Sequence, residues 1–131
     1  MAMMRLSRGL IGVTACVVMA ACSQPLTVGT IQLGRSLNED SSIASLTSTF
    51  TPQETVYVAV LNPERGDGTL GVKWYYGSQL LSEREKTVSF KGAGATEFNL
   101  QSAAGFPVGD YSVEVFLDGQ SVGRRNFNVA N

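Results

Sequence analysis

Three pairs of carboxylates are the clearest candidates for chemistry in this chain. The 131 residues include no histidine, so neither a Ser-His-Asp nor a Cys-His arrangement can be built, and the commonest general base is missing. The carboxylate pairs are Glu83 with Glu85, Glu64 with Asp67, and Glu39 with Asp40. All of them lie in polar stretches that we expect to be solvated, where no burial raises a carboxyl pKa. The sequence therefore predicts a protein that is not an enzyme.

Ligands for a metal are equally scarce. Histidine is absent and both cysteines precede residue 23, so the soft and borderline ligands are missing from the rest of the chain. Residues 62–68 (NPERGDG) and 38–42 (NEDSS) contain oxygen ligands, but neither has the spacing of a calcium loop. We read both as turns. The sequence predicts no metal and no cofactor.

The two cysteines, Cys16 and Cys22, stand at the end of a stretch laid out like an export signal. Arg5 and Arg8 precede an apolar segment, residues 9–19, which small residues follow. This segment is shorter than the about 20 residues needed to cross a bilayer. The sequence predicts a signal peptide over residues 1–21. A soluble secreted protein, released by cleavage after one of the two alanines before Cys22, is the alternative.

Residues 19–22, Met-Ala-Ala-Cys, resemble the lipobox of bacterial lipoproteins. Residues 13–16, Val-Thr-Ala-Cys, fit the same pattern, but cleavage there would leave only Gly9–Val13 as an apolar segment. Cys22 is therefore the favoured lipidation site. The resemblance implies diacylglycerol on the Cys22 sulfur and a fatty acyl chain, such as palmitate, on its amino group, a stable membrane anchor. Ser23 follows the cysteine, which by the same resemblance favours the periplasmic face of the outer membrane.

The remainder of the chain has the size of one domain. Of ten basic side chains two belong to the signal peptide, so the rest of the chain has eight basic and eleven acidic side chains and a formal charge of −3. A weakly acidic domain without a basic run is unsuited to nucleic acid. Residues 22–27 are predicted to be the lipid anchor and a short tether, and residues 28–131 a single folded domain.

Alternation of apolar and polar residues recurs between turn signals along this domain. It predicts strands over residues 28–33, 43–50, 55–61, 69–76, 86–90, 96–100, 111–117 and 121–129. Residues 82–87 (SEREKT) lack an apolar stripe and are predicted to be a solvated connection. Seven or eight short strands without an amphipathic helix predict an all-β antiparallel sandwich.

Two residues carry a resemblance to the immunoglobulin-like and fibronectin III-like sandwich. Trp74 stands in the middle of a strand, where such domains place a core tryptophan on the third strand, and Tyr111 has the position of a tyrosine corner. No inter-sheet disulfide is possible within residues 23–131. The stretch 50–129 also resembles immunoglobulin-like modules, mostly uncharacterised, of bacterial envelope lipoproteins. The resemblance implies a fold and says little about activity.

The closing hairpin carries a prediction of its own. Asp118-Gly119 is a type I′ turn signal, and counting outward from it pairs Val115 with Val122. Burial of Phe127 then requires an extra residue, so we expect a β-bulge near residues 123–125.

The predicted function is non-enzymatic protein binding by a lipid-anchored envelope protein. If residues 69–76 and 111–117 are neighbouring strands, their outward side chains share one surface, formed by Lys73, Tyr75, Glu114 and Phe116. Aromatic residues beside opposite charges are favoured in interfaces, although such pairs also stabilise sheets. The expected partner is another envelope protein. A glycan-binding or small-molecule-binding module, or a structural spacer of the envelope, is the alternative.

Overall fold

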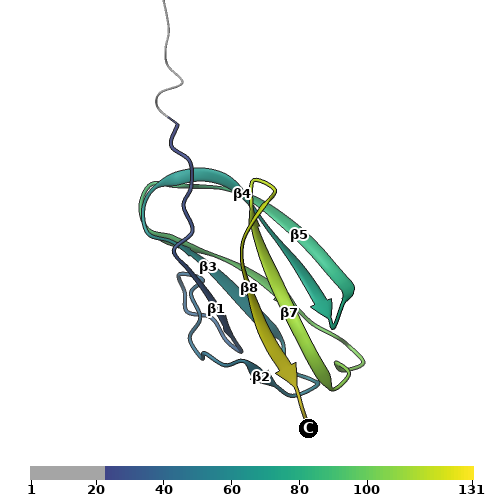
Figure 1. Ribbon diagram of the computed structural model, residues 1–131. Coiled ribbons are helices and arrows are strands. Elements are labelled where there is room, and N and C mark those ends of the chain that lie inside the picture. The colour runs from purple at the N-terminus through teal and green to yellow at the C-terminus, as the bar shows by residue number, and fades with distance from the viewer. Residues whose placement is uncertain (1–22) are drawn as a thin grey trace, which may run out of the picture.

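A computed structural model describes residues 23–131, and the predicted signal peptide and Cys22 lie outside the described residues. Eight strands form two facing sheets (Figure 1). The strands are β1 (Thr30–Gly34), β2 (Thr49–Phe50), β3 (Val56–Asn62), β4 (Gly66–Tyr76), β5 (Gln79–Phe90), β6 (Gly94–Leu100), β7 (Gly109–Leu117) and β8 (Gln120–Val129). Within this range no helix is long and apolar enough to span a membrane.

The architecture confirms the predicted immunoglobulin-like sandwich. A three-stranded sheet has the order β1-β3-β6, and a five-stranded sheet has the order β2-β8-β7-β4-β5. All neighbours are antiparallel except β2, which runs parallel to β8. No cysteine occurs in residues 23–131, so the sandwich is held by its core without a disulfide.

The core lies between the two sheets, and the predicted inward register of β4 is confirmed. Trp74 is 0% exposed, and Leu70 and Val72 on the same strand are buried with it. Phe127 of β8 meets the Trp74 ring edge-on, with the centroids 6.1 Å apart. The valines at alternate positions of β3 and β7 fill the rest of the interior, because successive side chains of a strand point to opposite faces.

Tyr111 is a tyrosine corner, as expected. Its hydroxyl donates a hydrogen bond of 2.6 Å to the carbonyl oxygen of Pro107, four residues upstream. The ring stacks on Phe127 with the centroids 5.3 Å apart. Burial, followed by the neighbouring Tyr76, raises the pKa of the Tyr111 hydroxyl above its ordinary value of 10.0.

The closing hairpin has the expected turn, but its bulge lies nearer to the turn than predicted. Asp118 and Gly119 both have positive φ, 50° and 85°, as a type I′ turn requires. Val115 pairs with Gly123, so Val122 is the extra residue and is 40% exposed. The predicted pairing of Val115 with Val122 is wrong. Phe127 is buried as the prediction required.

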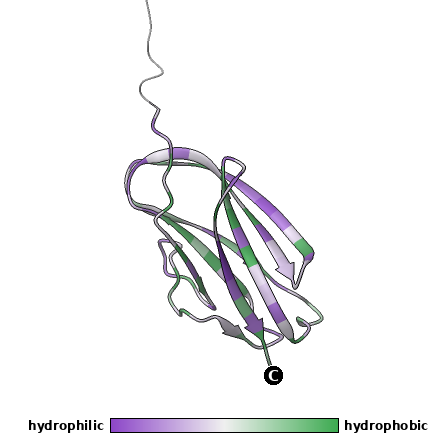
Figure 2. Ribbon diagram, viewed as in Figure 1, coloured by the Kyte–Doolittle hydropathy of each residue, from purple (hydrophilic) through white to green (hydrophobic). Residues whose placement is uncertain are grey.

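Two other predicted stretches differ from the structure. Residues 43–50 form a strand only at β2, with isolated bridges at Ile43 and Leu46. The residues between Ile43 and Phe50 are all exposed or partly exposed, so this stretch has no buried face that would hold a longer strand. Residues 82–87 are not a connection but the middle of β5, which pairs with β4 along its whole length. They read as solvated because nearly all of β5 is exposed, and Figure 2 shows this strand mostly in the hydrophilic colour.

The first described residues are attached to the start of β4. The amide of Leu26 donates to the carbonyl oxygen of Asp67 at 2.9 Å, and the amide of Asp67 donates to the carbonyl oxygen of Gln24 at 2.8 Å. Leu26 is 3% exposed and belongs to the core. Gly66 makes room for this segment, because a Cβ on it would stand 2.7 Å from the Pro25 oxygen. Part of the predicted tether thus packs on the domain.

Two long cationic side chains link the two sheets through hydrogen bonds. On one side Arg125 of β8 donates through Nε to the carbonyl oxygen of Ile31 in β1. On the other side Lys86 of β5 donates to the carbonyl oxygen of Glu97 in β6, and its ammonium lies 4.9 Å from the centroid of Phe98. These contacts occupy backbone acceptors on the two outer strands of the three-stranded sheet.

Candidate binding surface

The four residues predicted to share a surface lie on the side of the five-stranded sheet that faces away from the core. We call this side the outer face. Lys73 and Tyr75 come from β4, and Glu114 and Phe116 come from β7. β4 and β7 pair directly, as expected, with Lys73 opposite Glu114. All four side chains are partly exposed. The alternation that buries Trp74 on the other side of β4 directs them outward.

A row of alternating charge crosses the outer face. From β8 to β5 it consists of Arg124, Glu114, Lys73 and Glu83, each directly opposite the next in the strand register. Arg124 Nη2 and Glu114 Oε1 are 2.9 Å apart. Opposite charges facing each other across strands stabilise the pairing and fix its register. We refer to these four residues as the charge row.

The two aromatic rings lie on either side of the charge row and do not touch each other. Tyr75 is opposite Ser112, and its ring lies 5.1 Å from the guanidinium carbon of Arg124. Phe116 is opposite Gly71, and its ring lies 5.0 Å from Lys73 Nζ. Each cation therefore covers part of one ring and holds it in position.

Arg124 is the residue of this surface that the sequence prediction missed. An uninterrupted count from the hairpin turn places it on the core side, and a bulge near residues 123–125 leaves its direction open. Because the bulge is at Val122, Arg124 points outward and donates to both Glu114 and Ser112, at 2.9 and 2.8 Å. A serine and a glutamate two residues apart on β7, facing an arginine, are the only signal that could have indicated it.

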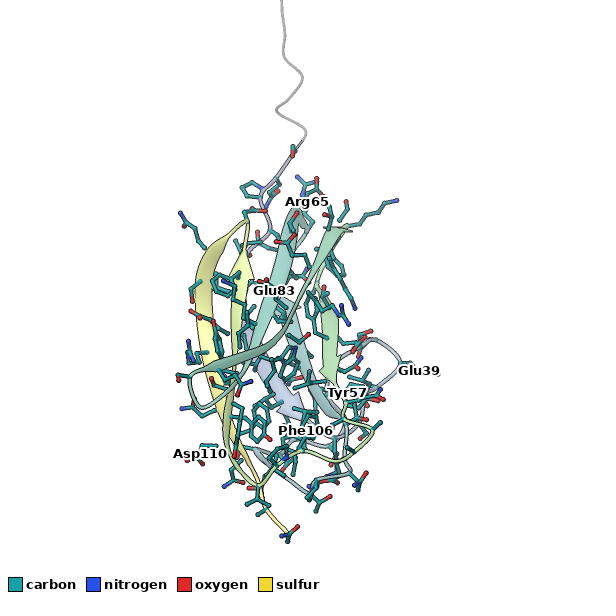
Figure 3. The ribbon with its side chains drawn as sticks, turned by 90° about the vertical axis from the view of Figure 1, so that its right-hand side faces the viewer. Glu39, Tyr57, Arg65, Glu83, Phe106 and Asp110 are labelled. Atoms are coloured by element: carbon teal, nitrogen blue, oxygen red, sulfur yellow. The ribbon has the colours of Figure 1, made fainter. Side chains whose placement is uncertain are left out.

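Two shallow hollows flank the charge row. The first, of about 540 Å³, lies over β4, β5 and β7 and includes Gly71, Glu83, Glu85 and Phe116 in its wall. A Cβ on Gly71 would lie 3.4 Å from the Arg84 oxygen and from Glu85 Cγ, so the missing side chain deepens this hollow. Figure 3 labels Glu83, one of the residues in the wall of this hollow.

The second hollow, of about 560 Å³, lies over β7 and β8. It is lined mainly by polar side chains: Asp110, Ser112, Arg124, Asn126 and Asn128, with Ser48 and Thr49 at the β2 side. Its amides, hydroxyls and carboxylate offer donors and acceptors without a buried charge.

Among residues 23–131, no three or more Asp and Glu side chains gather into a group that could hold a metal ion. Glu83 and Glu85 project from the exposed edge strand β5, and Glu64 lies in an exposed turn. Hydrogen bonds from the Ser42 hydroxyl and amide lower the pKa of Asp40. A hydrogen bond from the Thr51 amide, followed by Arg35, lowers the pKa of Glu54. Both carboxylates stabilise loops.

No protein-family model matches the sequence, and a search of curated proteins found no match. Solved structures do match the fold. An immunoglobulin-like protein of Pseudomonas aeruginosa matches with a TM-score of 0.54 and 13% identity, over 81% of this chain and 95% of that one. The C-terminal domain of Wzt matches with a TM-score of 0.52 and 11% identity, over 83% of this chain and 75% of that one.

A cycloisomaltooligosaccharide glucanotransferase of Paenibacillus sp. also matches, with a TM-score of 0.51 and 15% identity. The match covers 82% of this chain and 14% of that much longer one. At these identities the likeness establishes an immunoglobulin-like β-sandwich module and nothing about activity.

Proposed function

We propose that this protein is a non-enzymatic lipoprotein of the bacterial envelope, anchored through Cys22 at the periplasmic face of the outer membrane, whose sandwich binds another envelope protein. The Met-Ala-Ala-Cys stretch at residues 19–22 supports the anchor. The chemistry of the described side chains supports a binding role, because the carboxylates are dispersed over loops and edges.

The observation that carries the binding function is the composition of the outer face. Two partly exposed rings, Tyr75 and Phe116, lie on either side of charges of both signs, and Gly71 leaves a hollow beside one of them. Aromatic residues held rigidly on strands lose little entropy when a partner covers them. The partner expected here is a folded protein whose contact surface is apolar at its centre and carries both positive and negative side chains at its rim.

The binding test removes both rings. The double variant Tyr75→Ser with Phe116→Ser is compared with wild type in crosslinking from envelope membranes, with the captured protein identified by mass. We expect loss of one specific crosslinked partner with little change in melting temperature. Unchanged capture by a folded double variant would overturn the proposal.

Tyr57→Ser is the matched control for this test. Tyr57 is a partly exposed ring on β3, in the opposite sheet, and Figure 3 labels it away from Glu83. Its replacement should leave capture unchanged. Loss of capture in Tyr57→Ser as well would show that any loss of an aromatic ring perturbs the domain, against a specific outer face.

The anchor is tested separately. Wild-type protein should incorporate a fatty-acid label, and Cys22→Ser should not. Label retained in Cys22→Ser but lost in Cys16→Ser would place the anchor on the other cysteine.

A second candidate function, glycan binding, is favoured by the polar hollow over β7 and β8. Paired amides such as Asn126 and Asn128 are suited to the hydroxyl groups of a sugar. Asn126→Ala with Asn128→Ala should abolish retention on envelope polysaccharide if this function is correct, while the variants of Tyr57 and Phe116 serve as controls.

A further inference from the structure

The segment that follows the predicted anchor is part of the folded domain from Gln24 onward. Beyond the two backbone hydrogen bonds to Asp67, Gln24 uses its side chain: Nε2 donates to Glu64 at 3.3 Å, and Oε1 accepts from Arg65 Nε at 3.0 Å. Pro25 forms a parallel bridge with Asp67. The chain is thus fixed by backbone, side-chain and core contacts within three residues.

Only Ser23 lies between Cys22 and this fixed segment. Two residues of fully extended chain span at most about 7 Å. A free tether of ten residues would instead allow a root-mean-square separation of roughly 17 Å. A lipid on Cys22 therefore holds the domain against the membrane surface.

The end of the sandwich that meets the surface is defined by contacts among its turns. The side-chain amide of Asn62 donates to the carbonyl oxygens of Glu64 and Gly92, at 2.9 and 3.1 Å, and so joins the turn at residues 63–65 to the turn at residues 91–93. Asp118 of the closing hairpin accepts from the Thr69 amide at 2.9 Å. In Figure 3, Arg65 lies at the end where the chain enters, and Phe106 and Asp110 lie toward the opposite end.

We propose that this end, formed by residues 63–65, 91–93 and 118–119, lies on the phospholipid head groups. The sandwich then stands upright on the membrane, and its outer face is a side wall. This inference rests on the proposed anchor at Cys22. β5 has twelve residues, so its length along the strand is about 40 Å, and it separates the turn at residues 77–78 from the membrane end.

The charges of the membrane end fit a zwitterionic surface. Glu64, Arg65, Lys91 and Asp118 carry two charges of each sign. Such a surface is neither drawn to nor repelled by anionic lipid over a long range. Its position is therefore set by the short link to the lipid, and the contact should not depend on the phosphatidylglycerol content.

The experiment uses the scarcity of cysteine. The signal peptide carries Cys16 away and acylation occupies the Cys22 thiol, so one introduced cysteine is the only free thiol. Gly92→Cys places it at the membrane end, and Ser78→Cys places it at the far end; both positions are exposed turns. A Cβ on Gly92 meets no atom within 4 Å. Each acylated protein is put into phosphatidylethanolamine vesicles with a minority of phosphatidylglycerol and reacted with a polyethylene-glycol maleimide.

We expect Gly92→Cys to react several-fold more slowly than Ser78→Cys on vesicles, at every phosphatidylglycerol content. Insertion of about ten Gly and Ser residues between Ser23 and Gln24 should remove the difference. In protein produced without residues 1–22, which carries no lipid and no other cysteine, the two introduced thiols should react alike.

Equal rates on vesicles, or a difference that survives the insertion, would overturn the orientation while leaving the anchor intact. Absence of fatty-acid label on Cys22 would overturn the anchor and the orientation with it. The two failures are therefore distinguished by the label.

Discussion

At the scale of single residues, Trp74 and Tyr111 connect the sequence to the packing. Trp74 lies on the interior strand β4 and contacts Phe127 of β8, and Phe127 in turn stacks on Tyr111 of β7. Three neighbouring strands of one sheet are thus joined through their rings. Loss of a large side chain here leaves a void that rigid strands on both sides cannot fill.

Replacement of Trp74 by alanine should lower the free energy of unfolding by about 3–5 kcal/mol. For a domain of this size that is a large part of the total, which is about 5–15 kcal/mol. Urea denaturation followed by circular dichroism measures the change. A variant that melts within a degree or two of wild type would contradict the structure.

Tyr111→Phe keeps the ring stacking and removes the hydrogen bond to Pro107, so we expect a loss of about 1 kcal/mol. Its pH dependence is more specific. The raised pKa means that the folded state favours the protonated Tyr111 hydroxyl over the ionised one. The stability that this hydroxyl contributes is therefore complete below pH 10 and is lost as the pH rises through the pKa of the folded state. Wild type should therefore lose stability above pH 10 more steeply than Tyr111→Phe. If stability falls equally with pH above 10 in wild type and in Tyr111→Phe, groups other than Tyr111 cause the loss of stability.

At the scale of elements, β5 differs most from its neighbours. It is long, exposed, and paired only with β4, so its other edge is open. Glu83 and Glu85 point to the outer face, and Arg84 and Lys86 to the inner side, by the register with β4. When two copies of one strand pair about a two-fold axis perpendicular to the sheet, one residue faces its own copy. Any register centred on residues 83–86 therefore opposes like charges.

Removal of these charges should permit β5 to pair with itself. The triple variant Glu83→Thr, Arg84→Thr, Glu85→Thr is expected to dimerise or aggregate, as threonine favours strands and carries no charge. Sedimentation of residues 23–131 measures this, with Glu39→Thr as a control that changes the net charge equally. A monomeric triple variant would show that the charges do not protect this edge.

The sequence predicts best those strands that bury one face in the core and expose the other. In most of β4 and β7 every second residue is large and apolar, as at Leu70, Val72 and Trp74, so alternation alone predicts the bounds of these strands to within a few residues. The first half of β5 has no buried face and gave no such signal. The position of the bulge at Val122 depends on packing against the other sheet, because a Cβ on Gly123 would lie 2.8 Å from Ile31 Cδ1.

The candidate surface was predictable to the same extent. Alternation within β4 and β7 and their pairing placed Lys73, Tyr75, Glu114 and Phe116 together. The outward direction of Arg124 could not be predicted, because it depends on the position of the bulge. The separation of the two rings depends on the register of β4 and β7, and alternation is consistent with registers that differ by two residues.

At the scale of the whole molecule, β8 joins the parts that are farthest apart in sequence. It pairs with β7 on one side and with β2 on the other, and through Arg125 it reaches β1 in the opposite sheet. Two of its side chains, Phe127 and Val129, are in the core.

Deletion of residues 126–131 should abolish cooperative unfolding, because it removes both buried side chains and the partner of β2. Deletion of Asn131 alone, an exposed residue, should have little effect. Thermal melts of the two truncated proteins make the comparison. A cooperative transition in the protein that lacks residues 126–131 would mean that the core stays folded without the end of β8.

The place of β8 in the sheet also sets the order of events during synthesis. β8 is an interior strand, and β2 pairs with its residues 128–129, which lie almost eighty positions later in the sequence. Contacts so distant in sequence form slowly, and they cannot form at all before residues 128–129 have been made. Without residues 120–129 the five-stranded sheet lacks an interior strand and the core lacks Phe127 and Val129, so a partly synthesised chain cannot close the sandwich until β8 has been made.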